Sequence, residues 1–86
     1  MAATVTITPA AKVELDAVPL VIRNRIVEVF ERLSKWPAVS GAKPLRGNLH
    51  GSYRIRTGDY RIVFTVSPYG QKLTLWKIGN RGTVYD

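Results

Sequence analysis

The sequence predicts a single α+β domain with the element order β-α-α-β-β-β, in which two N-terminal helices cover one face of an antiparallel sheet. Two stretches carry this prediction. Residues 19–35 place apolar side chains at the 3.6-residue period of a helix, and residues 53–66 alternate apolar with other side chains around a Gly-Asp dipeptide. The 86 residues (1–86) are expected to form one small domain that buries about 60 % of the surface of its unfolded chain.

The first two elements are a strand and a helix. The run TVTIT at residues 4–8 is β-branched and alternating, which favours a strand. Thr8 and Pro9 are typical of the N-cap and the first position of a helix, which is expected to extend to about Ala17. The narrow apolar seam of this helix would be formed by Val13 with Ala17, or by Ala10 with Val13.

A second helix is expected from Pro19 to about Lys35, because the Val18-Pro19 pair interrupts the first helix. Its apolar stripe follows one helical face and consists of Ile22, Ile26, Val29, Phe30 and Leu33. Two ion pairs with i,i+4 spacing mark the solvated face and carry no functional role: Glu28 with Arg32, and Glu31 with Lys35.

A connecting segment rich in glycine and proline follows at residues 38–51 and brings three polar side chains toward the next element. These are Lys43, Arg46 and His50. A single histidine in a loop is usually solvated and inert, but one beside a basic groove can titrate near neutral pH. His50 is therefore a candidate of second rank.

The stretch YRIRTGDYRIVFTV at residues 53–66 predicts a β-hairpin with Gly58 and Asp59 as its two-residue loop. The register then follows, from Thr57 opposite Tyr60 to Tyr53 opposite Phe64. Alternation places one set of side chains on the core face: Tyr53, Ile55, Thr57, Tyr60, Ile62 and Phe64. The other face carries three cations and is expected to be exposed: Arg54, Arg56 and Arg61.

Within that register Arg56 lies directly opposite Arg61. Like charges at opposed positions of a hairpin repel, so the pairing is a local cost that stability alone would not select. It indicates an anion that is bound over this face. The alternative is that solvated arginines merely keep the sheet soluble.

The rest of the chain continues the antiparallel meander. Residues 67–70 predict a turn and residues 72–78 a third strand. Residues 79–82 predict another turn, which delivers Arg81 to the end of that strand, and residues 83–86 a short final strand segment.

The charge distribution points to a polyanionic partner. Lys and Arg number 13 against 6 Asp and Glu, a formal net charge of +7 with a pI near 10.3. Residues 43–86 hold eight basic and two acidic side chains, whereas residues 1–42 hold five and four. Nucleic acid is the simplest partner, and a membrane surface or an acidic protein would satisfy the same electrostatics. With no secretory signal and no apolar run of membrane-spanning length, the protein is expected to stay in the cytoplasm.

The sequence lacks the motifs of most catalytic chemistries. The absence of cysteine excludes thiolate metal sites and thiol nucleophiles, no zinc-ligand spacing exists, and neither Gly-rich phosphate loop is present, so no metal and no cofactor are expected. Arginines and tyrosines on a surface suit one reaction: attack of an RNA 2′-hydroxyl on its own adjacent phosphate. The protein then has to position the backbone, stabilise charge and manage two protons.

The segment KPLRGNLHGSYRIRTGDYRIVFTV, followed by a strand and GNRGTVYD, resembles the RelE/ParE superfamily of type II toxin-antitoxin toxins over residues 43–86. Within that superfamily it looks most like the RelE-like mRNA interferases. The resemblance implies the helices-on-sheet fold, cleavage of mRNA in the ribosomal A site, and inhibition by a cognate antitoxin that wraps the toxin. It also implies that the antitoxin covers the cationic face or displaces the C-terminal tyrosine.

Carried over by position, the resemblance implies five catalytic residues: Arg54, Arg56, Arg61, Arg81 and Tyr85. In this hypothesis Arg61 and Arg56 clamp the scissile phosphate and Arg54 holds a neighbouring phosphate. Arg81 stabilises or protonates the 5′-oxygen leaving group, and Tyr85 orients the 2′-hydroxyl or the base. Further contacts to RNA are assigned to Lys43, Arg46, His50 and Lys77, with His50 as the reserve proton carrier.

The resemblance leaves three interpretations open: a toxin that cleaves mRNA, a toxin that inhibits DNA gyrase, and a module that only binds its antitoxin. The best-studied RelE-type enzymes have lysines on the first hairpin strand, and the arginines at 54 and 56 keep the charge but cannot act as general bases at neutral pH. ParE-like relatives instead bind and poison DNA gyrase without cleaving RNA. A decayed or purely structural module would only bind its antitoxin. The set Arg61, Arg81 and Tyr85 favours RNA cleavage.

Overall fold

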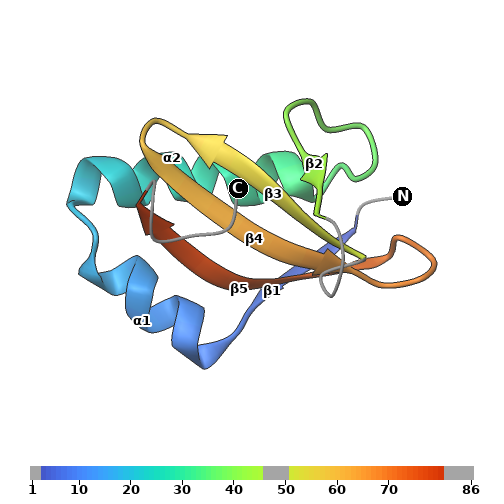
Figure 1. The fold of residues 1–86 in the computed structure, drawn as a ribbon, viewed down its shortest axis with the longest axis horizontal. Helices are drawn as coiled ribbons and strands as arrows, with labels where there is room; N and C mark the ends of the chain where they lie inside the picture. The colour runs from blue at the N-terminus through green and yellow to red at the C-terminus, as the bar shows by residue number, and fades with distance from the viewer. Residues whose placement is uncertain (1–2, 46–50, 81–86) are drawn as a thin grey trace.

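The computed structural model describes residues 3–45 and 51–80, in which two helices and five strands follow one another along the chain (Figure 1). The elements are β1 (Thr4–Ile7), α1 (Pro9–Ala17), α2 (Leu20–Leu33), β2 (Lys43–Pro44), β3 (Ser52–Thr57), β4 (Tyr60–Val66) and β5 (Lys72–Asn80). The strands form one sheet in the order β1-β5-β4-β3-β2. This is the predicted α+β architecture, with α2 behind β3 and β4 in the view of Figure 1.

The sheet is antiparallel from β2 to β5, but its opposite edge differs from the prediction. Strand β1 pairs parallel with β5, from Thr4 opposite Lys72 to Ile7 opposite Leu75. These strands come from opposite ends of the sequence, so no hairpin turn fixes their relative direction. The predicted connecting segment also contributes a strand, since β2 places Lys43 opposite Arg54 at the other edge of the sheet.

Helix α1 begins where the sequence predicts but buries a different face. The Thr8 hydroxyl accepts a hydrogen bond from the Ala11 amide at 3.2 Å, and Pro9 occupies the first turn. The buried residues are Ala11 and Leu15, while Val13 is 69 % exposed. The predicted seam was therefore wrong. Alanine at position 11 gives almost no apolar signal in the sequence, although positions 11 and 15 share one helical face.

Helix α2 follows its predicted apolar stripe and ends two residues earlier than expected. Ile26, Val29 and Leu33 are buried, and Ile22 and Phe30 pack against the same core. This confirms the predicted core face of the helix. No helix among residues 3–45 and 51–80 is both long and apolar enough to cross a membrane.

The main core lies between the helices and one face of the sheet. Its central side chain is Phe64, which is fully buried and contacts the rings of Trp36 and Tyr53 at centroid distances of 5.7 and 5.8 Å. Trp36 in turn meets Tyr53 edge to face at 4.9 Å. Ile55 and Ile62 join this core from the hairpin, as its alternation predicted.

A β-bulge in β5 explains how this strand serves both faces of the sheet. Val63 pairs with Lys77 while the next residue, Phe64, pairs with Leu75, so Trp76 is the additional residue. The bulge lets Ile78, three residues after Leu75, return to the core. Strand β5 continues to Asn80, so the turn that the sequence predicted at residues 79–82 does not begin at Gly79.

Candidate functional site

The hairpin that displays the cationic side chains has the predicted geometry. Gly58 takes φ +60° at the first loop position, a conformation that tight two-residue hairpins demand and glycine adopts without strain. The register runs from Thr57 opposite Tyr60 to Tyr53 opposite Phe64 and includes Arg56 opposite Arg61. The pairing of Arg56 with Arg61 that was inferred from the sequence is therefore a feature of the folded protein.

The two arginines of this pair differ in burial, which corrects the expectation of a fully exposed face. Arg56 is exposed, whereas Arg61 is only 5 % exposed. Arg61 lies on β4, which is flanked on both sides by β3 and β5, and Arg56 lies on β3 near the sheet edge. The same face carries a second apolar cluster of Leu45 and Val63 with Trp76, so it is partly covered.

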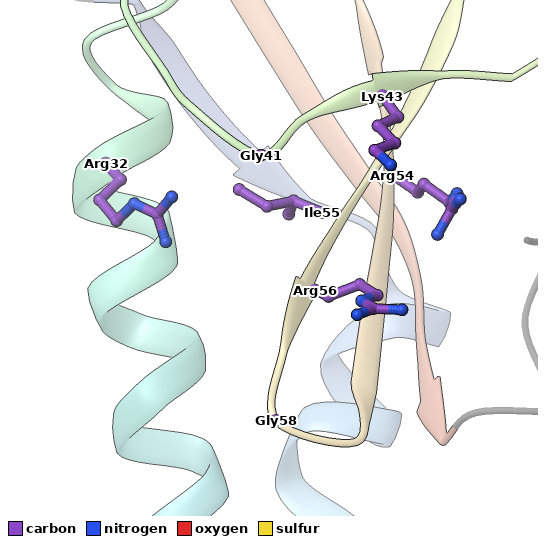
Figure 2. Close-up of a pocket in the computed structure, with 7 residues that line it drawn as sticks. All are labelled: Arg32, Gly41, Lys43, Arg54, Ile55, Arg56 and Gly58. Atoms are coloured by element: carbon purple, nitrogen blue, oxygen red, sulfur yellow. The ribbon is translucent and has the colours of Figure 1, made fainter.

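A second pair of opposed cations lies beside the first. Lys43 on β2 is opposite Arg54 on β3, and directly opposed residues share a face of the sheet. Lys43, Arg54 and Arg56 line a pocket of about 470 Å³ together with Gly41, Ile55, Gly58 and Arg32 of α2 (Figure 2). None of these lining residues is acidic, so the local field attracts anions.

Arg32 is the residue of this pocket that sequence reasoning missed. The sequence suggested an ion pair with Glu28, but the guanidinium donates a hydrogen bond to the Ser40 carbonyl at 2.9 Å. Arg25, two helical turns earlier, places its guanidinium 3.4 Å from where a Cβ on Gly58 would stand. The seven-residue spacing of two arginines beside the apolar stripe was the signal that could have identified this flank of α2.

Lys77, assigned to RNA contact from the sequence, has a different environment. Its ammonium group lies 2.7 Å from Oε2 of Glu14, and the Ile78 amide donates a hydrogen bond to the other Glu14 oxygen at 3.1 Å. One carboxylate of α1 thus holds the end of β5. Lys77 therefore already has a counter-ion within the protein.

Four residues of the predicted site lie outside the residues that the structure describes: Arg46, His50, Arg81 and Tyr85. Their roles stay predictions, as does the strand segment expected at residues 83–86. The structure thus brings Lys43, Arg54 and Arg56 together in one pocket, with Arg61 on the neighbouring strand. Within residues 3–45 and 51–80, no group of three His, Cys, Asp or Glu side chains could hold a metal ion.

Comparison with known proteins places the chain in a family of toxins. The family model for the ParE toxin of the type II toxin-antitoxin system parDE matches residues 5–85. Toxin RelE of Mycobacterium tuberculosis is 35 % identical over 82 residues, covering 94 % of this chain and 84 % of that protein. Toxin RelG of the same bacterium is 31 % identical over 83 residues, covering 95 % and 94 %.

The fold gives the same result. The toxin-antitoxin complex RelBE2 from Mycobacterium tuberculosis contains a chain that superposes with a TM-score of 0.82 at 29 % identity, over 94 % of this chain and 93 % of that one. The family match spans both helices and the cationic hairpin. This chain therefore belongs to the RelE/ParE superfamily of type II toxin-antitoxin toxins.

Proposed function

We propose that this protein is a toxin that cleaves mRNA, and that RNA phosphates are the counter-ions of its cationic sheet face. One observation carries the proposal. Two cross-strand pairs of like charge, Lys43 with Arg54 and Arg56 with Arg61, lie on one face of three neighbouring strands. Opposed like charges are unfavourable neighbours in a sheet, and the phosphates of a bound polyanion would supply counter-ions to both pairs.

The reaction that fits this face needs no nucleophile from the protein. The 2′-hydroxyl oxygen attacks its adjacent phosphorus, the bond to the 5′-oxygen breaks, and the products end in a 2′,3′-cyclic phosphate and a 5′-hydroxyl. Arg61 and Arg56 would clamp the scissile phosphate and stabilise its added negative charge, and Arg54 would hold a neighbouring phosphate. Guanidinium groups stay protonated at neutral pH, so none of the three takes the proton from the 2′-hydroxyl.

Proton transfer is assigned to the C-terminal segment and to the only histidine. Arg81 would stabilise or protonate the departing 5′-oxygen, and Tyr85 would orient the 2′-hydroxyl or the base. His50 is the reserve proton carrier: its neutral imidazole would accept the proton that leaves the 2′-hydroxyl, while the departing 5′-oxygen takes up a proton and becomes the 5′-hydroxyl. These roles rest on the resemblance of GNRGTVYD and of the hairpin segment to the family.

Two partners follow from the same family. A relative of this chain is found in the toxin-antitoxin complex RelBE2, which supports a cognate antitoxin as the inhibitor of this protein. Antitoxin binding would cover the cationic face or displace Tyr85. The ribosome, with mRNA in its A site, is the second partner that we propose.

The family model that matches is described for ParE, and this observation supports one alternative: a protein that binds and inhibits DNA gyrase without cleaving RNA. A supercoiling assay with purified gyrase distinguishes the two functions. Inhibition of supercoiling together with intact mRNA would favour the alternative and overturn the proposal.

Primer extension on an mRNA, with and without ribosomes, tests the proposal directly. Wild-type protein is expected to give discrete stops, and the same reactions show the cleavage position and the dependence on ribosomes. Arg61→Ala and Arg81→Ala are expected to lose most of the cleavage. Full activity in either variant would remove that residue from the mechanism, and no cleavage by wild type in either reaction would overturn the function.

A further inference from the structure

The outer edge of β3 is open next to the hairpin turn. The Leu45 amide donates to the Ser52 carbonyl at 2.9 Å, so Ser52 turns its backbone groups toward β2. In an antiparallel strand the backbone N–H and C=O groups of successive residues point alternately to the two sides of the strand. Arg54 and Arg56 follow Ser52 at intervals of two residues, so their backbone groups point to the same side as those of Ser52. Strand β2 begins at Lys43, opposite Arg54, and so does not extend alongside Arg56. The backbone of Arg56 therefore faces the pocket and has no partner strand in the described sheet.

Arg32 reaches this edge from the other layer of the protein. In Figure 2 its side chain extends from α2 toward the sheet, while Arg54 and Arg56 extend from the opposite side of β3. The hydrogen bond from Nη2 to the Ser40 carbonyl holds the guanidinium beside Gly41, where a Cβ would stand 3.9 Å from Nη2. A guanidinium has five N–H donors, and this bond uses one of them.

We infer that this pocket is an accessory phosphate site, in which Arg32 binds a backbone phosphate of the RNA away from the scissile one. The inference deepens the proposed function and rests on it, because Arg54 and Arg56 belong to both sites. RNA that leaves the scissile position crosses the open edge of β3, between Gly41 and Gly58, and meets Arg32 on the helix side. The cationic surface thereby continues from the sheet face onto α2.

The lining favours RNA over an acidic protein segment. Four of the seven lining residues are cationic, two are glycines, and the apolar member, Ile55, is 1 % exposed. A peptide usually gains affinity and register from apolar pockets for alternate side chains, which such a surface does not offer. A nucleic-acid backbone needs cations, donors and room, and the pocket supplies them over about 470 Å³.

The salt dependence of RNA binding measures the proposed contact between Arg32 and a phosphate independently of RNA cleavage. Two uncleavable RNAs would be used, both 2′-O-methylated at the scissile nucleotide: a dinucleotide, and a longer single strand with the same central sequence. Each phosphate contact to a single strand contributes about 0.7 to the slope of log K against log salt concentration. For the longer RNA, Arg32→Gln is expected to reduce that slope by about 0.7. Binding of the dinucleotide is expected to be unchanged.

Two variants control for other effects of the substitution. Arg32→Lys keeps the charge and is expected to retain the slope of wild type. Arg23→Gln removes the same charge from the same helix, but Arg23 pairs with Asp16 at 3.0 Å on the α1 side, so the slope is expected to stay unchanged. Thermal unfolding of Arg32→Gln verifies that the loss of the Ser40 bond leaves the protein folded.

The results separate this inference from the function on which it rests. Equal slopes for Arg32→Gln and Arg23→Gln on the longer RNA, with mRNA cleavage intact, would overturn the accessory site alone. An Arg32-dependent slope without any cleavage by wild type would leave the phosphate site standing and overturn the nuclease. An acidic peptide whose binding requires Arg32, combined with an unchanged RNA slope, would assign the pocket to a protein partner and overturn the inference.

Discussion

The two faces of the β3–β4 hairpin are built from alternate residues of the same strands, yet they serve opposite ends. Ile55, Ile62 and Phe64 point toward the helices and are at most 1 % exposed. Arg54, Arg56 and Arg61 point the other way and place like charges side by side. One face stabilises the fold, and the other is the face on which we propose that RNA phosphates bind. The pleat lets both functions share one backbone without sharing side chains.

The largest expected effect is a loss of stability when a side chain of the core face is removed. Phe64→Ala removes a fully buried ring and its contacts with Trp36 and Tyr53, which should lower the free energy of unfolding by about 3–5 kcal/mol. Urea denaturation measures the change. Tyr69→Ala is the matched control, because Tyr69 is 87 % exposed and its loss should cost less than about 0.5 kcal/mol. Equal costs would contradict the placement of the core.

The next largest expected effect is a loss of mRNA cleavage when an arginine of the cationic face is removed. Arg61→Ala is expected to slow mRNA cleavage by about 10²–10³-fold, the usual loss when one charge-stabilising group is removed from a transition state. Because Arg61 is buried, the unfolding free energy of the variant has to be measured in parallel. Arg61→Lys keeps the charge but loses the bidentate geometry, so its rate of mRNA cleavage should lie between those of wild type and Arg61→Ala. Cleavage at the wild-type rate by a folded Arg61→Ala would remove Arg61 from the reaction.

A smaller effect is expected at Lys77, where it distinguishes a structural ion pair with Glu14 from a contact to RNA. Glu14→Gln loses the ion pair with Lys77 but keeps an acceptor for the Ile78 amide, so the unfolding free energy should fall by about 1 kcal/mol. Cleavage of mRNA should stay unchanged. Faster cleavage or tighter RNA binding in this variant would show that Lys77 is an RNA contact after all, held back by its carboxylate partner.

The smallest effect concerns the pH dependence of the scaffold. A hydrogen bond from Lys12 is the main cause that lowers the pKa of Asp16 below its ordinary value of 3.8, and the charges of Lys12 and Arg23 act in the same direction. A lowered pKa in the folded state contributes stability above the unfolded pKa, and this stability is lost as the pH falls through the folded value. Asp16→Asn should therefore flatten the acid limb of the stability profile slightly. An unchanged limb would contradict this assignment.

The sequence predicted best where periodicity and turn chemistry agree. Gly58 and the alternation around it predicted the hairpin register residue by residue, and the stripe from Ile22 to Leu33 predicted the core face of α2. Both signals are local, since each arises from residues that are neighbours along the chain. The α+β fold with two helices on one side of the sheet followed from them.

What escaped prediction depends on contacts between distant segments. The parallel direction of β1, the Trp76 bulge and the Glu14 bridge to β5 each join segments more than 10 residues apart, and no local pattern encodes them. The same holds for the site. Alternation predicted the shared face of Arg54, Arg56 and Arg61, but the burial of Arg61 and the approach of Arg32 needed the three-dimensional structure.

The separation of the two faces is tested most directly by single-turnover mRNA cleavage with Arg56→Gln in a translating extract. Arg56 is exposed, so replacing it with glutamine should change the free energy of unfolding by less than about 0.5 kcal/mol. Cleavage should nevertheless fall by about ten-fold or more, which corresponds to about 1.4 kcal/mol of transition-state stabilisation. Cleavage at the wild-type rate by this variant would contradict the account.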